Sequence, residues 1–418
     1  MKIVIKINHL DSGMHKKILI VTEYFYPEEF KINEVAIAWK QKGYEVDILT
    51  QNPTYPLGQT FDGFTNKWYS KASYNGINIY RVKAVTGYKK NLFKKLLKYF
   101  TFMLLGSLVA LKIGKRYDYV LGFDVGALTG MVPAIILKKF YKKNVTLWVQ
   151  DIWPDSVYAY GFKKNKLIEF FLNGFVKFVY KNTSSFAISA KGFENKIKPY
   201  LSEAKEIKYV PNWADEFDKS LEPFNFSIDK KLHFTFAGNI GKVQNLDNII
   251  LAFGSLSDDL LQKAQLNIVG DGSHMESLQN LVLTNSIENV VFLGKQPRKD
   301  MYKYFLASDF LIVSLIDEPI FALTVPSKMQ TYIAACKPIL AIIKGESAQI
   351  VQENNLGYIA HPNDIDGVKN IFNDAINSTE NTIIKLTQNC EYLTNTIFNK
   401  EKVLDSLLNL TIKGNLTK

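Results

Sequence analysis

The segment Phe236–Leu246, with the sequence FAGNIGKVQNL, constrains the fold of this chain more than any other. A short apolar run, His233–Ala237, ends in two closely spaced glycines, and a helical pattern of apolar residues follows at once. This order of strand, tight turn and helix frees backbone N–H groups at the positive end of a helix dipole, where a phosphate or diphosphate binds well. Because the segment lies past the middle of the chain, it predicts a second α/β unit that follows a first one.

The rest of the chain also alternates short apolar runs with longer helical patterns. In the first half we expect strands at 17–22, 45–49, 77–82, 119–123, 145–149, 185–188 and 207–210. In the second half we expect them at 233–237, 265–269, 290–293, 310–313, 339–343 and 357–360. Strands separated by helices predict an α/β protein whose parallel, doubly wound sheets are covered on both faces. Ligands of such sheets bind at the carboxyl ends of the strands, so we expect two facing Rossmann-like domains with the site in the cleft between them.

The expected domain boundaries follow from this pattern. Residues 1–16 precede the first convincing strand and form an extension, so Met14 is an alternative start to Met1. We expect an amino-terminal Rossmann-like domain at 17–211 and a carboxyl-terminal Rossmann-like domain at 212–395. Residues 396–418 are expected to form a last helix and a tail, and packing of this helix back on the first domain is left open.

Charge is distributed unevenly between the two halves. Residues 1–215 hold 33 Lys and Arg against 17 Asp and Glu, a net charge of +16, whereas the remainder has a net charge of −5. Solvated surface lysines explain part of this positive excess. The alternative is that the basic first half faces an anionic partner such as lipid phosphates. Nucleic acid is not expected, because no nucleic-acid-binding module is recognisable. No secretory apolar segment opens the chain, and two cysteines give neither a disulfide framework nor a metal set, so we expect a cytoplasmic protein.

One apolar stretch, Tyr99–Gly114, stands apart from the rest. It is preceded by lysines and is shorter than the roughly 20 apolar residues of a membrane-spanning helix. Its length favours a largely buried helix of the first domain. The alternative is a helix on a membrane surface, and a docked helix that presents its basic end to lipid combines the two.

Several motifs together resemble those of glycosyltransferase family 4, in particular the branch that builds capsular and O-antigen polysaccharides and includes fucosamine transferases. The resemblance extends over nearly the whole chain from Lys17. It rests on the order and spacing of YFYPEEFKINEVA (24–36), PTYPLG (53–58), WVQDIWPDS (148–156), YVPNWAD (209–215), AGNIGKVQNL (237–246), IVGDGS (268–273) and FALTVPSKMQTYIAACKP (321–338).

The resemblance implies two facing domains of the GT-B type and transfer of a sugar from a nucleotide diphosphate with retention of configuration, without a bound metal. By the same resemblance, the donor carries UDP and an N-acetylated hexosamine or 6-deoxy hexosamine, and the acceptor is a polyprenyl-diphosphate-linked glycan. The enzyme would then work at the cytoplasmic face of the cell membrane. The residues expected to contact the donor are Gly238, Asn239, Ile240, Gly241, Gln244, Gly270, Asp271, Gly272, Gln296, Arg298, Pro326, Ser327 and Thr331.

The donor side departs from the family pattern at several positions. The wider family has an Arg and a Lys at the places of Asn239 and Gln244. It also has two glutamates, of which the later, ribose-binding one falls at Thr331 and the earlier falls near Ala322–Leu323, and neither place is acidic here. Lys328 and Arg298 are therefore the candidate cations for the leaving diphosphate, with Lys242 as a weaker candidate. We expect Ser327 to cap the helix that follows.

The acceptor side is expected to hold Asp151 as the base, because a carboxylate after the run 145–149 would receive the proton of an attacking hydroxyl. A helix-cap or turn aspartate is the competing interpretation. Gln150 lies beside it, and Trp153 would offer an apolar platform to a sugar. Lys31 and Asn33, which replace a glycine pair of the family, would reach the sugar or the diphosphate from the opposite side.

Other classes of protein share parts of this pattern. A sugar-nucleotide 2-epimerase has the same two-domain architecture, but it needs acid and histidine chemistry that five histidines scarcely supply. A non-catalytic sugar-nucleotide-binding scaffold of a polysaccharide complex agrees with the missing glutamates. A dinucleotide dehydrogenase is disfavoured, because the Gly270–Gly272 stretch lacks the full glycine fingerprint.

Overall fold

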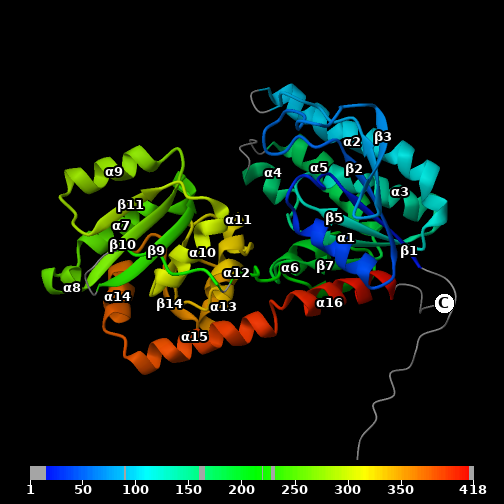
Figure 1. Ribbon diagram of the computed structural model, residues 1–418. Helices are drawn as coiled ribbons and strands as arrows, with labels where there is room; N and C mark the ends of the chain where they lie inside the picture. The colour runs from blue at the N-terminus through cyan, green and yellow to red at the C-terminus, as the bar shows by residue number, and fades with distance from the viewer. Residues whose placement is uncertain (1–15, 89–90, 160–164, 219, 227–230, 414–418) are drawn as a thin grey trace, which may run out of the picture.

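The computed structural model describes residues 16–88, 91–159, 165–218, 220–226 and 231–413, which form two α/β domains side by side (Figure 1). The expected extension before the first strand lies, apart from Lys16, outside these residues, as does the end of the carboxyl-terminal tail. Each domain contains one sheet covered by helices on both faces, as the alternation of apolar runs predicts.

The amino-terminal sheet has eight strands in the order β3-β4-β2-β1-β5-β6-β7-β8. Their bounds are β1 Lys17–Thr22, β2 Glu45–Gln51, β3 Tyr69–Tyr74, β4 Ile77–Val82, β5 Tyr119–Asp124, β6 Asn144–Val149, β7 Ser185–Ile188 and β8 Glu206–Tyr209. All neighbours are parallel except β3, which pairs antiparallel with β4. The sequence analysis missed β3 because this edge strand is largely exposed and carries no apolar run.

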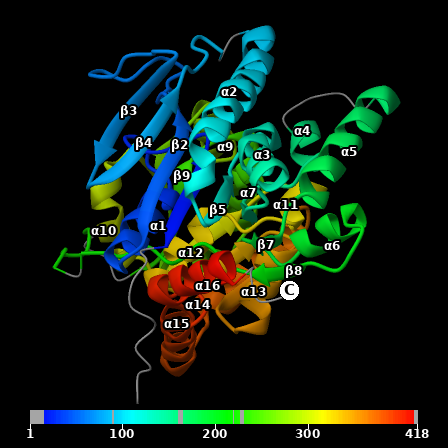
Figure 2. The same ribbon diagram turned by 90° about the vertical axis from the view of Figure 1, so that its right-hand side faces the viewer.

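Helices cover the two faces of this sheet unequally. On one face lie α1 (Lys31–Gln41) and α16 (Lys400–Ile412), and on the other lie α2 (Leu92–Ile113), α3 (Val132–Tyr141) and α5 (Lys166–Lys181) (Figure 2). Two short helices, α4 (Asp155–Ala159) and α6 (Phe193–Ile197), follow the strands β6 and β7.

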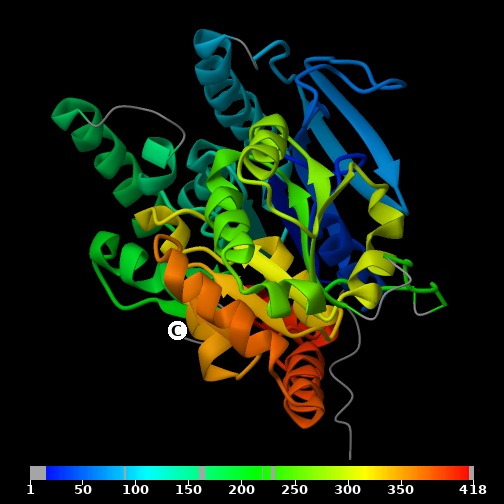
Figure 3. The ribbon, with the colours of Figure 1, turned by 90° about the vertical axis from the view of Figure 1, so that its left-hand side faces the viewer.

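The carboxyl-terminal sheet has six parallel strands in the order β11-β10-β9-β12-β13-β14. Their bounds are β9 Leu232–Asn239, β10 Ala264–Asp271, β11 Val290–Gly294, β12 Phe310–Ser314, β13 Ile339–Ile342 and β14 Gly357–Ala360. Its helices are α7 Leu246–Gly254, α8 Asp258–Lys263, α9 Met275–Thr284, α10 Met301–Ala307, α11 Pro319–Ala322, α12 Ser327–Ala334, α13 Glu346–Glu353, α14 Ile365–Ile376 and α15 Glu380–Asn395 (Figure 3). Short 3-10 helices occur at Gly114–Arg116, Leu128–Met131, Lys198–Tyr200, Lys242–Gln244 and Arg298–Asp300.

The chain crosses between the domains twice. After β8 it enters the second domain, and after α15 it returns so that α16 packs in the core of the first (Figure 1). Leu404 and Leu407 of α16 are fully buried there, and the indole N–H of Trp39 donates to the Leu404 carbonyl at 3.3 Å. The two crossings touch where the Ala214 N–H donates to the Phe398 carbonyl at 2.9 Å. This second crossing ties the helix that ends the described chain to the first domain.

Candidate active site

Lys328, in the first turn of α12, lies against Gly238 near the end of β9. Gly238 has a φ of 135°, and a Cβ built on it would come within 2.5 Å of Lys328 Cε. Glycine is therefore required here both by the backbone and by the space that the lysine fills. The sequence analysis expected both residues at the donor site, and the structure places them in contact.

The ammonium group of Lys328 is poorly compensated. Its Nζ lies 3.6 Å from the centroid of the Phe236 ring, and burial lowers its pKa to about 7. In the part of the chain that the structure describes, we find no carboxylate that pairs with it. A buried cation with only an aromatic face as partner is poised to take an anion.

The turn after Gly238 differs from the expectation. Strand β9 continues through Asn239, and the 3-10 helix Lys242–Gln244 separates Gly241 from α7, so no α-helix begins directly after the glycines. The Ile240 N–H donates to the Asp271 carbonyl at 3.0 Å, and the Gly241 N–H donates to Gln244 Oε1 at 2.9 Å. These two backbone groups, expected to be free for a diphosphate, are already bonded: the end of β10 takes the Ile240 N–H, and the side chain of Gln244 folds back onto the Gly241 N–H.

The stretch Gly270–Gly272 supports this turn from the neighbouring strand. A Cβ on Gly270 would lie 1.8 Å from the Gly238 carbonyl oxygen, so glycine is needed for the close approach of β10 to β9. Asp271 Oδ1 accepts from the Gly272 N–H at 2.8 Å. Gly270 and Gly272 thus lie against Gly238 and Ile240, and the Asp271 side chain bonds within its own stretch.

Helix α12 begins differently from the expectation. Its N-cap residue is Pro326, and no side-chain cap is present, so Ser327 is the first helical residue and not the cap. The Ser327 carbonyl accepts from Thr331 Oγ1 at 3.0 Å, one turn further on. Lys328 and Thr331 are three residues apart and so share one face of the helix.

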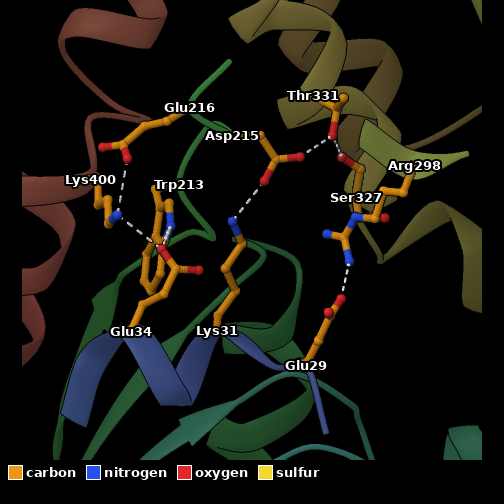
Figure 4. Close-up of polar contacts among 10 residues, drawn as sticks. All are labelled: Glu29, Lys31, Glu34, Trp213, Asp215, Glu216, Arg298, Ser327, Thr331 and Lys400. Atoms are coloured by element: carbon orange, nitrogen blue, oxygen red, sulfur yellow. Dashed lines mark hydrogen bonds and ion pairs between the residues drawn. The ribbon is translucent and has the colours of Figure 1, made fainter. Parts of the chain in front are cut away.

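Polar contacts join the two domains beside α12 (Figure 4). Asp215, on the first crossing, accepts from Thr331 Oγ1 at 2.8 Å and from Lys31 Nζ at 2.9 Å. Arg298 pairs with Glu29 at 2.8 Å, and both side chains are about 80% exposed (81% and 80%), so this pair contributes little stability. Segments that follow strands of both sheets therefore meet here.

Two further expected residues make local contacts. The Asn33 side-chain amide donates to the Glu28 carbonyl at 2.7 Å, and its Oδ1 is buried without a partner. The Gln296 amide donates to the Leu293 carbonyl at 2.6 Å. Neither contact reaches across to the other domain.

On the first domain, Asp151 is held at the carboxyl end of β6. Its Oδ2 accepts from the Gly126 N–H at 3.0 Å, and burial raises its pKa. The indole N–H of Trp153 donates to the Gly126 carbonyl at 2.9 Å, and Trp153 is only 9% exposed. Trp153 therefore supports the loop that holds Asp151 and does not present the open platform expected for a sugar. Gln150 accepts from Asn212 at 2.9 Å, which leaves its amide nitrogen without a partner.

The sequence analysis missed two carboxylates at the carboxyl ends of β1 and β5, which lie in order on one side of β6. Glu23 follows β1 and Asp124 ends β5, and both are buried. Burial raises the pKa of Glu23, and burial followed by the charge of Asp151 holds the pKa of Asp124 well above its usual range. Neither oxygen of Asp124 has a hydrogen-bond partner. Their position after apolar runs, the same signal that singled out Asp151, would have found them.

Charged groups from other elements surround this carboxylate cluster. Lys98 of α2 is 4% exposed, donates to Tyr24 Oη at 2.5 Å and lies 3.9 Å from Glu23. Glu28 accepts from the Thr54 and Tyr55 N–H groups, yet burial raises its pKa to about 7. Lys98 points into the domain, although it is one of the lysines that precede the apolar stretch Tyr99–Gly114 in the sequence.

Glu346 makes a further contact between the domains that the sequence did not indicate. It begins α13 in the second domain, and its carboxylate accepts from the N–H groups of Lys191 and Gly192 at 2.6 and 2.8 Å. Those N–H groups lie at the start of α6 in the first domain, where a carboxylate is favoured.

Helix α2 is less buried than the sequence analysis favoured. The stretch Leu96–Arg116 has a mean hydropathy of 1.7, but only 33% of its most apolar window is buried within the protein. Phe102 and Ala110 face the core, whereas Phe100 and Leu104 are 50% and 59% exposed. The helix therefore buries one stripe and exposes another that is also apolar.

Comparison with known proteins agrees with this architecture. Similar solved structures include the lipopolysaccharide outer core galactosyltransferase WaaB, with a TM-score of 0.65, 14% identity and coverage of 95% of this chain and 99% of that one. Another is HepE of Anabaena in complex with UDP and glucose, with a TM-score of 0.63, 15% identity and coverage of 94% and 99%. The fold is thus the two-domain GT-B fold of glycosyltransferases.

The second domain can be assigned more closely. Residues 218–392 match the family described as "Glycosyl transferases group 1", so this part is a glycosyltransferase group 1 domain that contains Gly238 and Lys328. The chain is also 28% identical over 253 residues to a protein described as "Probable glycosyltransferase WbjE" of Pseudomonas aeruginosa. That match covers 57% of this chain and 62% of the relative, which is less than two thirds of its length.

Proposed function

We propose that this chain is a retaining glycosyltransferase of family 4 that transfers a sugar from a UDP-sugar to a lipid-linked oligosaccharide in the synthesis of a surface glycan such as capsule or O-antigen. The observation that carries the proposal is the contact of Lys328 with Gly238 in a glycosyltransferase group 1 domain. It provides a buried, uncompensated cation at the end of a central strand, where an α/β sheet binds its ligand.

The electrostatics of Lys328 suit a leaving diphosphate. Its lowered pKa is the cost of burial, and an incoming anion removes that cost. The negative charge on the diphosphate grows as the bond to the sugar breaks, so the ammonium group stabilises the transition state more than the ground state. We propose that protein groups, and not a metal ion, carry this charge, which predicts activity in the presence of EDTA.

The proposed reaction breaks the bond between the anomeric carbon and the β-phosphate oxygen, whose electron pair leaves with UDP. The acceptor hydroxyl oxygen forms the new bond on the same face of the sugar. Its proton passes to Asp151, whose raised pKa makes it a stronger base than an exposed aspartate. The products are UDP and the glycoside, and positioning of the two substrates supplies the rest of the catalysis.

The identity of the sugar and nucleotide rests on likeness. The solved structure of HepE is a complex with UDP and glucose. By its resemblance to the fucosamine branch, the donor sugar of this chain is an N-acetylated hexosamine or 6-deoxy hexosamine.

We further propose that the enzyme binds the cytoplasmic face of the cell membrane through α2 and α5. Both helices lie on the same face of the sheet, and their amino-terminal ends project from the domain (Figure 2). Phe170 and Phe171 of α5 are 73% and 65% exposed, and Phe100 of α2 is 50% exposed. Because the first half of the chain has a net charge of +16, an anionic bilayer is the partner that fits both the apolar and the basic character.

Vesicle flotation tests this surface. Binding to vesicles that contain phosphatidylglycerol should fall when Phe170 and Phe171 are both changed to Ser, whereas Leu283→Ser, an equally exposed change on α9, should leave it unaltered. Binding that is the same in both variants would contradict the assignment of the membrane face.

The function itself is tested by ligand-dependent melting followed by transfer. UDP or a UDP-sugar at 100 times its Kd should add roughly 2.7 kcal/mol to the stability of the native state, unlike GDP or ADP. A polyprenyl-diphosphate-linked saccharide should then accept the sugar, and NMR of the product should show the donor's anomeric configuration. Nucleotide binding with neither transfer nor donor hydrolysis would favour the scaffold function, and a C2-epimerised sugar nucleotide would favour the epimerase.

A further inference from the structure

Asp215 is a carboxylate that the first crossing brings to the donor domain. Its two oxygens accept from Thr331 Oγ1 at 2.8 Å and from Lys31 Nζ at 2.9 Å (Figure 4). The Lys31 ammonium and the Thr331 hydroxyl outweigh partial burial and hold the pKa of Asp215 below its usual range. The side chain is still 33% exposed.

The position of Asp215 along α12 defines what it can reach. Its partner Thr331 lies one turn beyond Lys328 on the same face of the helix, where side chains are about 5–6 Å apart. A nucleotide that holds its diphosphate at Lys328 and runs along this face of α12 would place its ribose about one turn away, beside Thr331. A carboxylate at that distance is suited to accept hydrogen bonds from a pair of ribose hydroxyls.

The acceptor capacity of Asp215 also suits this role. An ionised carboxylate offers about four lone-pair sites, and two are used by Thr331 and Lys31. The remaining lone pairs are available to a ligand, because the side chain is partly exposed and is already held by a residue of each domain. Thr331 itself has no charge, so the helix does not supply a carboxylate at this point.

We propose that Asp215 binds the ribose hydroxyls of the donor nucleotide. The interdomain crossing would thereby supply the carboxylate that α12 itself lacks. The inference rests on the proposed function, because it requires a nucleotide diphosphate at Lys328. It also makes ribose recognition dependent on the crossing and on Lys31, which positions the carboxylate from the first domain.

The test compares UDP with 2′,3′-dideoxyuridine diphosphate by calorimetry. The wild-type protein should bind UDP about tenfold more tightly or better, since hydrogen bonds to a charged group are lost in the analogue. Asp215→Asn keeps an acceptor for Thr331 and should lower the affinity for UDP while leaving that for the dideoxy analogue unchanged. The preference for UDP should then nearly vanish.

Two further variants distinguish ribose binding by Asp215 from a purely structural role of its contacts between the domains. Glu216→Gln removes the neighbouring carboxylate, which pairs with Lys400 at 3.3 Å, and should keep the preference. Thr331→Glu in the Asp215→Asn background returns a carboxylate to α12 and should restore part of the preference.

The outcomes distinguish this inference from the proposed function. If the wild-type protein binds UDP and Asp215→Asn still discriminates against the dideoxy analogue, Asp215 does not bind the ribose, whereas the proposed function stands. If the wild-type protein binds no nucleotide diphosphate, the proposed function fails first.

Discussion

At the carboxyl edge of the first sheet, three acidic side chains end or follow the adjacent strands β1, β5 and β6, whereas at the edge of the second sheet the buried group beside β9 is a lysine. Glu23, Asp124 and Asp151 have pKa values raised by burial, and Lys328 has one lowered by burial. In both places burial is the cause, because it favours the uncharged form of a carboxyl group and of an amino group alike. In the proposed function this difference assigns opposite partners to the two edges: an acceptor hydroxyl that gives up its proton at the first, and the donor diphosphate at the second.

The largest expected effect comes from removing the cation. Lys328→Met should lower turnover with a UDP-sugar by about 10²-fold or more, because a group that stabilises the leaving charge is lost from a water-poor site. It should also weaken UDP binding in calorimetry. Lys263→Met on α8, where the lysine forms an exposed pair with Asp259, serves as the control. Near-normal turnover of the Lys328 variant would contradict the proposed role of Lys328 at the edge of the second sheet.

A change on the opposite edge should separate chemistry from donor binding. Asp151→Asn should lower transfer by about 10²-fold while leaving the Kd for UDP unaltered, since the proton acceptor lies on the acceptor side. Asp155→Asn, which disrupts an ion pair with Lys196 at 2.8 Å, should retain transfer. Equal loss of UDP affinity and turnover in Asp151→Asn would contradict the assignment of Asp151 to proton transfer alone.

The smallest effect concerns stability and its dependence on pH. The pKa of Asp124 is raised in the folded state, so folding takes up protons and the free energy of unfolding falls as pH rises above the unfolded pKa. Asp124→Asn removes this slope and should stabilise the protein by about 1 kcal/mol or more at pH 8 relative to pH 4.

Thermal or denaturant unfolding of both proteins at the two pH values measures the difference. The exposed Asp62→Asn variant corrects for a general change of net charge. A variant that is less stable than the wild type at pH 8 would show that the Asp124 carboxylate has a partner that favours its charge.

Much of the architecture could be predicted from the sequence, and the exceptions have physical reasons. The buried strand β1 is a nearly continuous apolar run and β4 is mostly apolar, and the structure has both with the expected bounds, whereas the exposed edge strand β3 has no such signal. The contact of Lys328 with Gly238 follows from two motifs 90 residues apart, but the state of the turn depends on Gln244 folding back, which no pattern reveals. Contacts between the domains, such as Glu346 with the start of α6, depend on tertiary geometry alone.

The pH dependence of UDP binding tests the central claim most directly. With a free-state pKa of about 7, Lys328 must take up a proton to bind the anion at higher pH, so the Kd for UDP should rise by up to about tenfold for each pH unit above 7. Lys328→Arg keeps its charge throughout and should show only the dependence that UDP itself contributes. Calorimetry from about pH 6 to about pH 9 should therefore give a steep curve for the wild type and a flatter one for the variant. Two parallel curves would contradict the assignment of the donor diphosphate to Lys328.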